Sequence, residues 1–214
     1  MKNNKITIQS VLAALLGVFF MALGLALNNR AHLGNDPVGI IYDGIRSAAN
    51  LTPEQLGMAS NVVNIALVVL LFFIGRRYIS IGTLIYFLPY GTFVSVGNKL
   101  CSWLFHSEAL AARIGLSVLG CLLLYLGIAI YIVVDIGTDP FTGLVLVIRD
   151  RLQKEYRLVK IGYDVTLIVL GTLLGGKLGV VTIITALLGG PVIQIYIDLL
   201  NKYVVGRRRK NAEI

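Results

Sequence analysis

Charged residues are scarce in this chain. Asp, Glu, Lys and Arg make up 14% of its 214 residues, and 57% of the residues are hydrophobic. A soluble domain usually carries about 25% charged residues. Several apolar stretches approach or exceed the roughly 20 residues needed to cross a bilayer core. The composition excludes an ordinary soluble protein and predicts an integral membrane protein that consists mostly of membrane spans.

Cysteine and histidine are also rare. Cys101 and Cys121 both lie in apolar stretches, no CxxC pair occurs, and His32 and His106 are isolated. We therefore expect neither a structural disulfide nor a metal site, and we interpret both cysteines as small buried hydrophobic residues. No cofactor is expected.

Catalytic signatures are missing as well. The sequence has no G-x-S-x-G, no H-E-x-x-H and no P-loop, which are the motifs of common hydrolases, metalloproteases and nucleotide-binding proteins. We expect no enzymatic activity, and ATP would have to enter through a partner protein. The net charge is +8, but the basic residues lie at the ends of apolar runs and are not interleaved with aromatic residues. We therefore predict no nucleic-acid partner.

Long apolar runs account for most of the chain. The predicted class is an all-α membrane protein with six transmembrane helices. They cover about 6–27, 53–74, 79–105, 108–134, 158–174 and 178–204. Two shorter segments, 37–49 and 140–152, are too short and too polar to span the bilayer alone, so each is expected to be a half-helix or an interfacial helix. The segment Thr52-Pro53-Glu54-Gln55 is typical of a helix start.

One short motif occurs twice. Leu33-Gly34-Asn35-Asp36-Pro37 precedes the first short helix, and Ile136-Gly137-Thr138-Asp139-Pro140 precedes the second. We call these two segments box 1 and box 2. A shift of 103 positions lays residues 23–46 on 126–149 with eight identities among 24 positions. We interpret this as an internal repeat within one membrane domain, with repeat 1 at 1–105 and repeat 2 at 106–214.

Basic residues indicate how the repeats are oriented. Three spans per repeat is an odd number, so the second repeat would lie upside down relative to the first. With a cytoplasmic N-terminus, 14 of the 19 Lys and Arg residues fall on the inner side, as the positive-inside rule requires. Both termini are then cytoplasmic. A model with parallel repeats is disfavoured, because the short segments with Asp43 and Arg46 would have to cross the membrane.

The two boxes have two interpretations, which the sequence leaves open. In the first, Asp caps a helix and Pro occupies its first position, so each box is only a helix start. In the second, two discontinuous helices at matching positions mark a transport pathway. An Asp at membrane depth would then cap, bind a cation or carry a proton.

Asp164 also has two interpretations. It lies a few residues into the fifth span, and the shift of 103 places it opposite Asn61, with Asn64 one turn further on. Either these residues form a cation or proton site shared by the second and fifth spans, or Asp164 pairs with Lys160 near the interface. The candidate pathway residues are Gly34, Asp36, Pro37, Asn61, Asn64, Gly137, Asp139, Pro140 and Asp164.

The order of these features resembles a known group. An apolar span, a Leu/Ile-Gly-x-Asp-Pro box, a short helix and a span leading to Gly82-Thr83 resemble the YczE/YyaS/YitT-like bacterial membrane proteins. The resemblance covers nearly the whole chain. It implies a multi-pass protein of the bacterial cytoplasmic membrane and supplies no known substrate or catalytic residues.

These observations favour a transporter or permease for a small solute or ion, with its site between the two repeats. Two alternatives stay open: a non-transporting assembly or regulatory subunit, and a substrate-binding membrane component of a larger transporter. The expected partners are the lipid bilayer, an unidentified small solute or ion, and either a second copy of the chain or another membrane subunit.

Overall fold

A computed structural model of the chain describes residues 6–107 and 109–202. In this part of the chain the fold is entirely helical, with eight α-helices, two short 3₁₀ turns and no strand. The α-helices are α1 (Ile8–Ala31), α2 (Pro37–Ala48), α3 (Leu56–Ile74), α4 (Ile81–Leu104), α5 (Leu110–Val134), α6 (Pro140–Leu152), α7 (Tyr156–Leu173) and α8 (Val180–Leu200). The 3₁₀ turns are η1 (Pro53–Gln55) and η2 (Arg76–Tyr78).

The helices correspond to the apolar runs and short segments, with differences at their ends. Residues 108 and 203–204, where the fourth span was predicted to begin and the sixth to end, lie outside the described residues, as do both termini. At Thr52, the Gln55 side chain accepts a hydrogen bond from the backbone N–H (2.9 Å), as predicted for a helix start. The first turn there is 3₁₀, and α3 follows it directly.

Helix α1 is one turn longer than the apolar run predicted. It continues through Asn28, Asn29 and Arg30 to Ala31. Asn28 is 1% exposed and accepts a hydrogen bond from Ser117 of α5 (2.9 Å). Asn29 donates to Asn98 of α4 (3.1 Å). These polar residues stay helical and internal because neighbouring helices satisfy their side chains.

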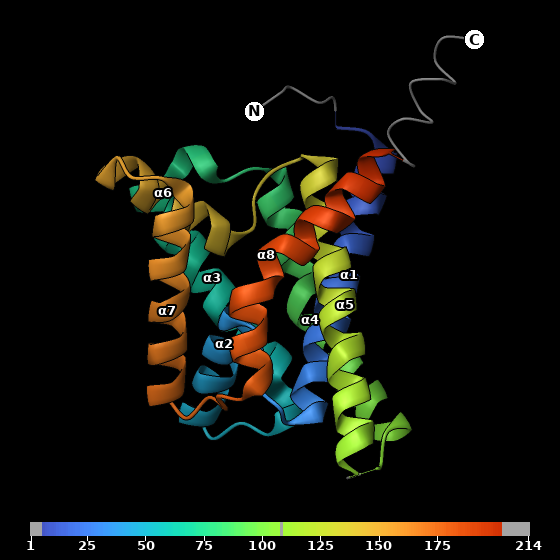
Figure 1. Cartoon of the computed structure of the whole chain (residues 1–214). Helices are drawn as coiled ribbons and strands as arrows, with labels where there is room; N and C mark the ends of the chain where they lie inside the picture. The colour runs from blue at the N-terminus through green and yellow to red at the C-terminus, as the bar shows by residue number, and fades with distance from the viewer. Residues whose placement is uncertain (1–5, 108, 203–214) are drawn as a thin grey trace, which may run out of the picture.

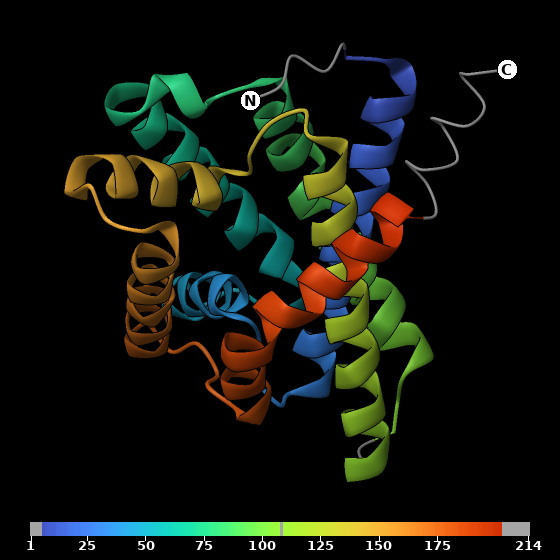
Figure 2. The same cartoon turned by 45° about the horizontal axis from the view of Figure 1, so that its top comes forward.

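The long helices α1 and α5 run side by side in opposite directions (Figures 1 and 2). Helix α4 packs on α1 and α8 packs on α5, while α2 contacts α7 and α3 contacts α6. The short helices α2 and α6 lie toward opposite ends of the bundle (Figure 1). The α2–α7 and α3–α6 contacts each join helices from different halves of the sequence, whereas the α1–α4 and α5–α8 contacts lie within one half.

The outer surface is strongly apolar. Phe73, Trp103, Leu173 and Leu187 are each more than 70% exposed, and large exposed apolar side chains occur on all six long helices. Soluble monomers rarely expose apolar patches of this extent. The molecule is therefore an integral membrane protein, as its composition predicted.

Four stretches in the described part are long and apolar enough to cross a membrane. They are Ile8–Ala31, Pro53–Ile74, Leu110–Val134 and Val180–Leu200. Helices α4 and α7 have 24 and 18 residues but are more polar, and α7 carries Arg157, Lys160 and Asp164. The prediction of six spans is therefore supported for four segments by length and composition, and it stays a prediction for α4 and α7.

Candidate functional site: the two Asp-Pro helix starts

The Asp of each box caps a short helix. Asp36 accepts hydrogen bonds from the backbone N–H groups of Val38 (3.3 Å) and Gly39 (3.2 Å) at the start of α2. Asp139 accepts from Phe141 and Thr142, both at 3.0 Å, at the start of α6. The predicted caps are confirmed, with Pro37 and Pro140 at the first helical positions. Both caps are only half-buried, although the prolines beside them are buried.

The glycine of each box is required by the backbone. Gly34 has φ +102°, and Gly137 has φ +149°, a region that side chains disfavour. Space is also lacking, because a methyl group on Gly34 would lie 2.7 Å from the Thr182 hydroxyl oxygen. A methyl group on Gly137 would lie 1.8 Å from the Ser80 hydroxyl oxygen. Each box therefore fits tightly against the first turn of a helix from the other half of the chain.

Backbone hydrogen bonds hold each box to that helix. The N–H of Val181 in α8 donates to the Leu33 carbonyl of box 1 (3.1 Å). The N–H of Gly82 in α4 donates to the Ile136 carbonyl of box 2 (3.2 Å). These N–H groups belong to the first turns of α8 and α4, where a helix has no internal partner for them. The irregular backbone of each box is thus satisfied by protein, as irregular backbone at membrane depth must be.

Aromatic side chains join the two short helices in the core. The Tyr42 ring of α2 packs edge-on against Phe141 of α6, with 5.6 Å between ring centres. Tyr42 also packs on Tyr90 of α4 (5.8 Å), which stacks on Tyr86 (4.8 Å). Tyr131 of α5 meets Tyr86 edge-on at 5.9 Å. We call these five residues the aromatic centre; all are at most 5% exposed.

Two polar groups in or beside the aromatic centre have no hydrogen-bond partner among the described residues. Tyr42 donates its hydroxyl hydrogen to the Asn64 amide oxygen (3.0 Å), and Asn64 is fully buried. Among the described residues, however, nothing bonds to the Asn64 amide nitrogen or to the Tyr131 hydroxyl. Buried polar groups are normally satisfied by protein, water or a ligand. These two groups are therefore suited to bind a small polar molecule or ordered water.

The charges around the aromatic centre are mostly negative. The Asp139 carboxylate acts electrostatically on Tyr42, Tyr86 and Tyr131. Asp36 lies within electrostatic reach of Asp164 and Lys160 of α7. Lys160 forms an ion pair with Asp164, as one of the two interpretations of Asp164 predicted. Because Lys160 neutralises Asp164, two carboxylates, Asp36 and Asp139, are left near the aromatic centre, and they favour a cation or a proton over an anion.

The remaining predicted residue, Asn61, faces α4. Its amide oxygen accepts a hydrogen bond from the Gly91 backbone N–H (3.1 Å). A methyl group on Gly91 would lie 2.2 Å from that same oxygen, so the contact packs α3 tightly on α4. The structure thus places Asn61 in a helix contact and Asn64 beside the aromatic centre.

Sequence reasoning did not single out Tyr42 and Phe141. Tyr42 lies six residues after Asp36, and Phe141 lies two residues after Asp139. A large aromatic residue soon after each helix start was the available signal, but aromatic residues are common both in cores and at membrane interfaces. Only the packing shows that these two rings meet.

Together the fold and this site define a helical integral membrane protein with two short helices that each begin at an Asp cap. The chain belongs to the family of unknown function DUF6198, whose profile matches residues 8–198. It is 26% identical to the uncharacterized membrane protein YczE of Bacillus subtilis, over 90% of this chain and 88% of that protein. It is 22% identical to the uncharacterized protein YyaS of Bacillus subtilis, over 91% and 96%.

A further relative is an uncharacterized protein of Haemophilus influenzae, 25% identical over 90% of this chain and 85% of that protein. The resemblance to the YczE- and YyaS-like proteins is therefore confirmed. No solved structure matches the chain.

Proposed function

We propose that this protein is a transporter or permease for a small solute, and that it binds and translocates its substrate without catalysing a reaction. Its site lies at the aromatic centre, between two inverted repeats of three spans each. The chain spans the bacterial cytoplasmic membrane six times with both termini in the cytoplasm. The observation that carries this proposal is the buried contact between Tyr42, in the middle of α2, and Phe141, in the first turn of α6.

Backbone conformation supports the repeat. His32 and Asp135 are both left-handed, with φ of 52° and 51°, and they are 103 residues apart. Asn50 and Gln153 are left-handed with φ of 54° and 52°, and the same shift relates them. Unrelated segments would not place such rare conformations at one fixed spacing. The shift that aligns the two boxes therefore also aligns the ends of the helices around them.

Helix contacts support an inverted relation between the repeats. The repeat relates α1 to α5, α2 to α6, α3 to α7 and α4 to α8. The counterpart of the α1–α4 contact is therefore α5–α8, the counterpart of the α2–α7 contact is α6–α3, and all four contacts occur. The hydrogen bonds that hold box 1 and box 2 exchange in the same way. A two-fold axis through the antiparallel pair α1 and α5 would produce this pattern. Repeats of this kind, with discontinuous helices near the midplane, are common in secondary transporters.

The chemistry of the site favours a cationic substrate or coupling ion. In each box the Asp carboxylate already accepts hydrogen bonds from the backbone N–H groups that would otherwise bind an anion at a helix start. The half-buried carboxylates and the tyrosine rings can both interact favourably with a cation. A proton, an alkali cation or a small amine is therefore the expected cargo or coupling ion.

A second candidate function is a non-transporting membrane subunit. Each of the three carboxylates already has a partner that accounts for it: two helix starts and Lys160. In that case the boxes only build the fold, and the protein serves a partner by assembly or regulation.

Reconstituted vesicles separate the two functions. We expect the protein to carry a proton, an alkali cation or a member of a panel of small amines. Asp36→Asn, Asp139→Asn and Asp164→Asn should lose this flux. The first two should fold normally because Asn also caps helices well, and the third should do so because Asn has nearly the size and shape of Asp. Asp198→Asn is the matched control, since Asp198 is exposed on α8 and bonds only to Gln194 among the hydrogen bonds found.

Two results would count against the proposal. Unchanged flux in all three variants would remove the site from the aromatic centre. No flux of any panel member by the wild-type protein would favour the non-transporting subunit.

A further inference from the structure

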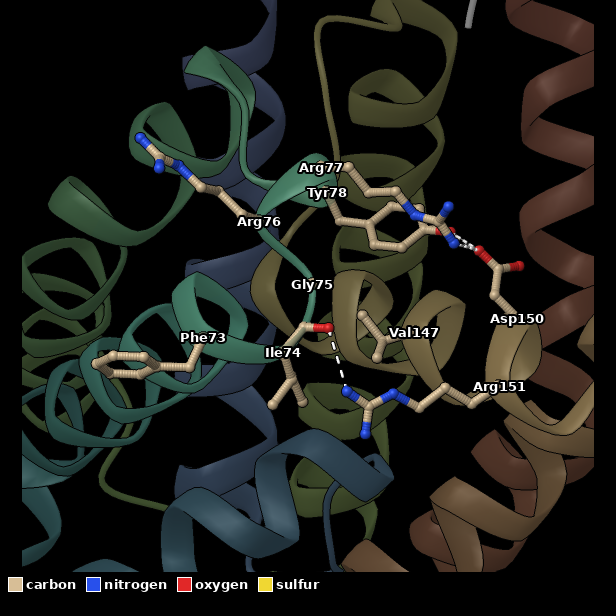
Figure 3. Close-up of a pocket in the computed structure, with 9 residues that line it drawn as sticks. All are labelled: Phe73, Ile74, Gly75, Arg76, Arg77, Tyr78, Val147, Asp150 and Arg151. Carbon is tan, nitrogen blue, oxygen red and sulfur yellow. Dashed lines mark hydrogen bonds and ion pairs between the residues drawn. The ribbon is translucent and has the colours of Figure 1, made fainter.

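A second polar feature lies away from the aromatic centre, next to the C-terminal end of α3. A pocket of about 380 Å³ opens between the η2 turn and α6. Arg77 and Tyr78 of η2 point toward Asp150 of α6, and Arg151 reaches across to the end of α3 (Figure 3). Arg76 also lines the pocket. Val147 forms part of its apolar wall.

The one carboxylate in the pocket is already matched. Asp150 forms an ion pair with Arg77 and accepts a hydrogen bond from the Tyr78 hydroxyl. Arg149 donates two further hydrogen bonds to it, at 2.7 and 2.8 Å. The Tyr78 hydroxyl and the Arg149 guanidinium hold the pKa of the Asp150 carboxyl below its ordinary value, so it is ionised at neutral pH. Its single negative charge does not balance the arginines around it.

Within the described part of the chain, Arg151 brings unused donor capacity to the pocket. Its guanidinium makes one long hydrogen bond, 3.4 Å, to the Ile74 carbonyl at the end of α3. A guanidinium has five N–H donors in a planar fork that suits phosphate oxygens. Arg77 adds a second guanidinium beside Asp150, whereas Arg76 points away toward Phe72 (Figure 3). With Arg77 and Arg151, the pocket is suited to an anion with several oxygens.

The surroundings indicate a membrane surface rather than bulk water. Phe72 and Phe73, in the last turn of α3, are 51% and 79% exposed. The Arg76 guanidinium lies over the Phe72 ring, 4.9 Å from its centre. Aromatic residues next to basic ones are typical of the level where lipid headgroups meet acyl chains. Basic pockets between transmembrane helices are known to bind anionic headgroups.

We propose that this pocket, formed by the η2 turn and the end of α6, binds the phosphate-bearing headgroup of an anionic phospholipid. Arg77 and Arg151 contact the phosphate oxygens, and Phe72 and Phe73 lie against the acyl chains. The site does not depend on the proposed transport function. A lipid bound there would link the end of α3 to α6 and so stabilise one end of the bundle.

Native mass spectrometry of the full chain in detergent tests this proposal. Phosphatidylglycerol should bind more tightly than phosphatidylcholine of the same acyl chains. The double variant Arg77→Gln/Arg151→Gln should weaken phosphatidylglycerol binding by about tenfold or more, the loss typical of charge-assisted hydrogen bonds. Arg151→Lys should bind at an intermediate level, because it keeps the charge but loses the fork. Lys154→Gln is the matched control: it removes one exposed charge just beyond α6, outside the pocket.

Several outcomes would overturn the proposal. These are equal binding of the two lipids, wild-type binding by the double variant, or an equal loss in Lys154→Gln, which would indicate general surface charge. Thermal unfolding of each variant shows whether it is folded. If the double variant does not fold, Arg151→Lys replaces it as the test. Excess inorganic phosphate distinguishes the source of the ligand. No displacement of phosphatidylglycerol assigns the pocket to lipid, and displacement by free phosphate contradicts a lipid-specific site.

Discussion

In each of the two boxes the Asp carboxylate caps a helix, and we propose for it a second role in transport. Asp36 and Asp139 accept hydrogen bonds from backbone N–H groups in the first turns of α2 and α6, which explains their presence without any ligand. Both nevertheless keep accessible surface beside a buried aromatic cluster. Helix capping was predictable because it depends on neighbouring residues alone. The packing of α2 and α6 through Tyr42 and Phe141 depends on contacts between distant segments, which local sequence does not specify.

At the residue scale, the Tyr42–Asn64 hydrogen bond gives a stability prediction. Tyr42→Phe leaves the buried Asn64 amide without a partner among the described residues, so stability should fall by about 1–3 kcal/mol. Tyr131→Phe should change stability little, because its hydroxyl makes no hydrogen bond in the described part of the chain. Thermal unfolding in detergent compares the two variants.

The double variant Tyr42→Phe/Asn64→Leu is the control for this prediction. It removes both polar partners and should recover part of the lost stability. Equal stability of Tyr42→Phe and the wild-type protein would show that the hydrogen bond contributes nothing measurable.

Helices α1 and α5 make an extensive contact, and glycines allow their close approach. A methyl group on Gly24 would lie 2.5 Å from the Gly120 carbonyl oxygen. A methyl group on Gly127 would lie 2.5 Å from the Gly17 carbonyl oxygen. The repeat shift of 103 relates Gly17 to Gly120 and Gly24 to Gly127, so each contact is the counterpart of the other. Small residues in α1 predicted close packing, but only the structure identifies α5 as the partner.

At the element scale, replacing one of these glycines with a larger residue should push α1 and α5 apart. Gly24→Leu forces a side chain into the α5 backbone and should destabilise the protein by at least the roughly 1–3 kcal/mol typical of overpacking. Gly115→Leu is the matched control on α5, because a methyl group there meets nothing within 4 Å. Thermal unfolding measures both variants. Equal effects of the two substitutions would contradict the close α1–α5 contact.

For the whole molecule, the proposed topology makes the two halves face opposite ways. Charge counting predicts it, and the exchanged helix contacts support it. Reporter proteins inserted after Asn50 and after Lys154 should therefore report opposite sides of the membrane. A reporter that is active only in the cytoplasm should be active after Lys154 and inactive after Asn50. The same side for both would rule out the inverted repeat.

The sequence predicted much of the fold but less of the site. Helix positions followed from long apolar runs and from Asp-Pro starts, which are local signals. The extension of α1 through Asn28 was missed because polar residues usually end an apolar run, and here Ser117 of α5 satisfies the side chain. The Lys160–Asp164 pair was predictable from a spacing of one turn. The aromatic centre was not, because its five rings come from four different helices.

By itself, the sequence determined the membrane class, the helix starts and the repeated boxes, because composition and short-range hydrogen bonding act within a few residues. The tertiary structure decided where those boxes lie. It set each box against the first turn of a helix from the other half and brought Tyr42 to Phe141. The physical reason is that contacts between distant segments depend on how helices pack. Gly24 and Gly127, for example, let α1 and α5 approach closely because each lies against a backbone carbonyl group of the other helix.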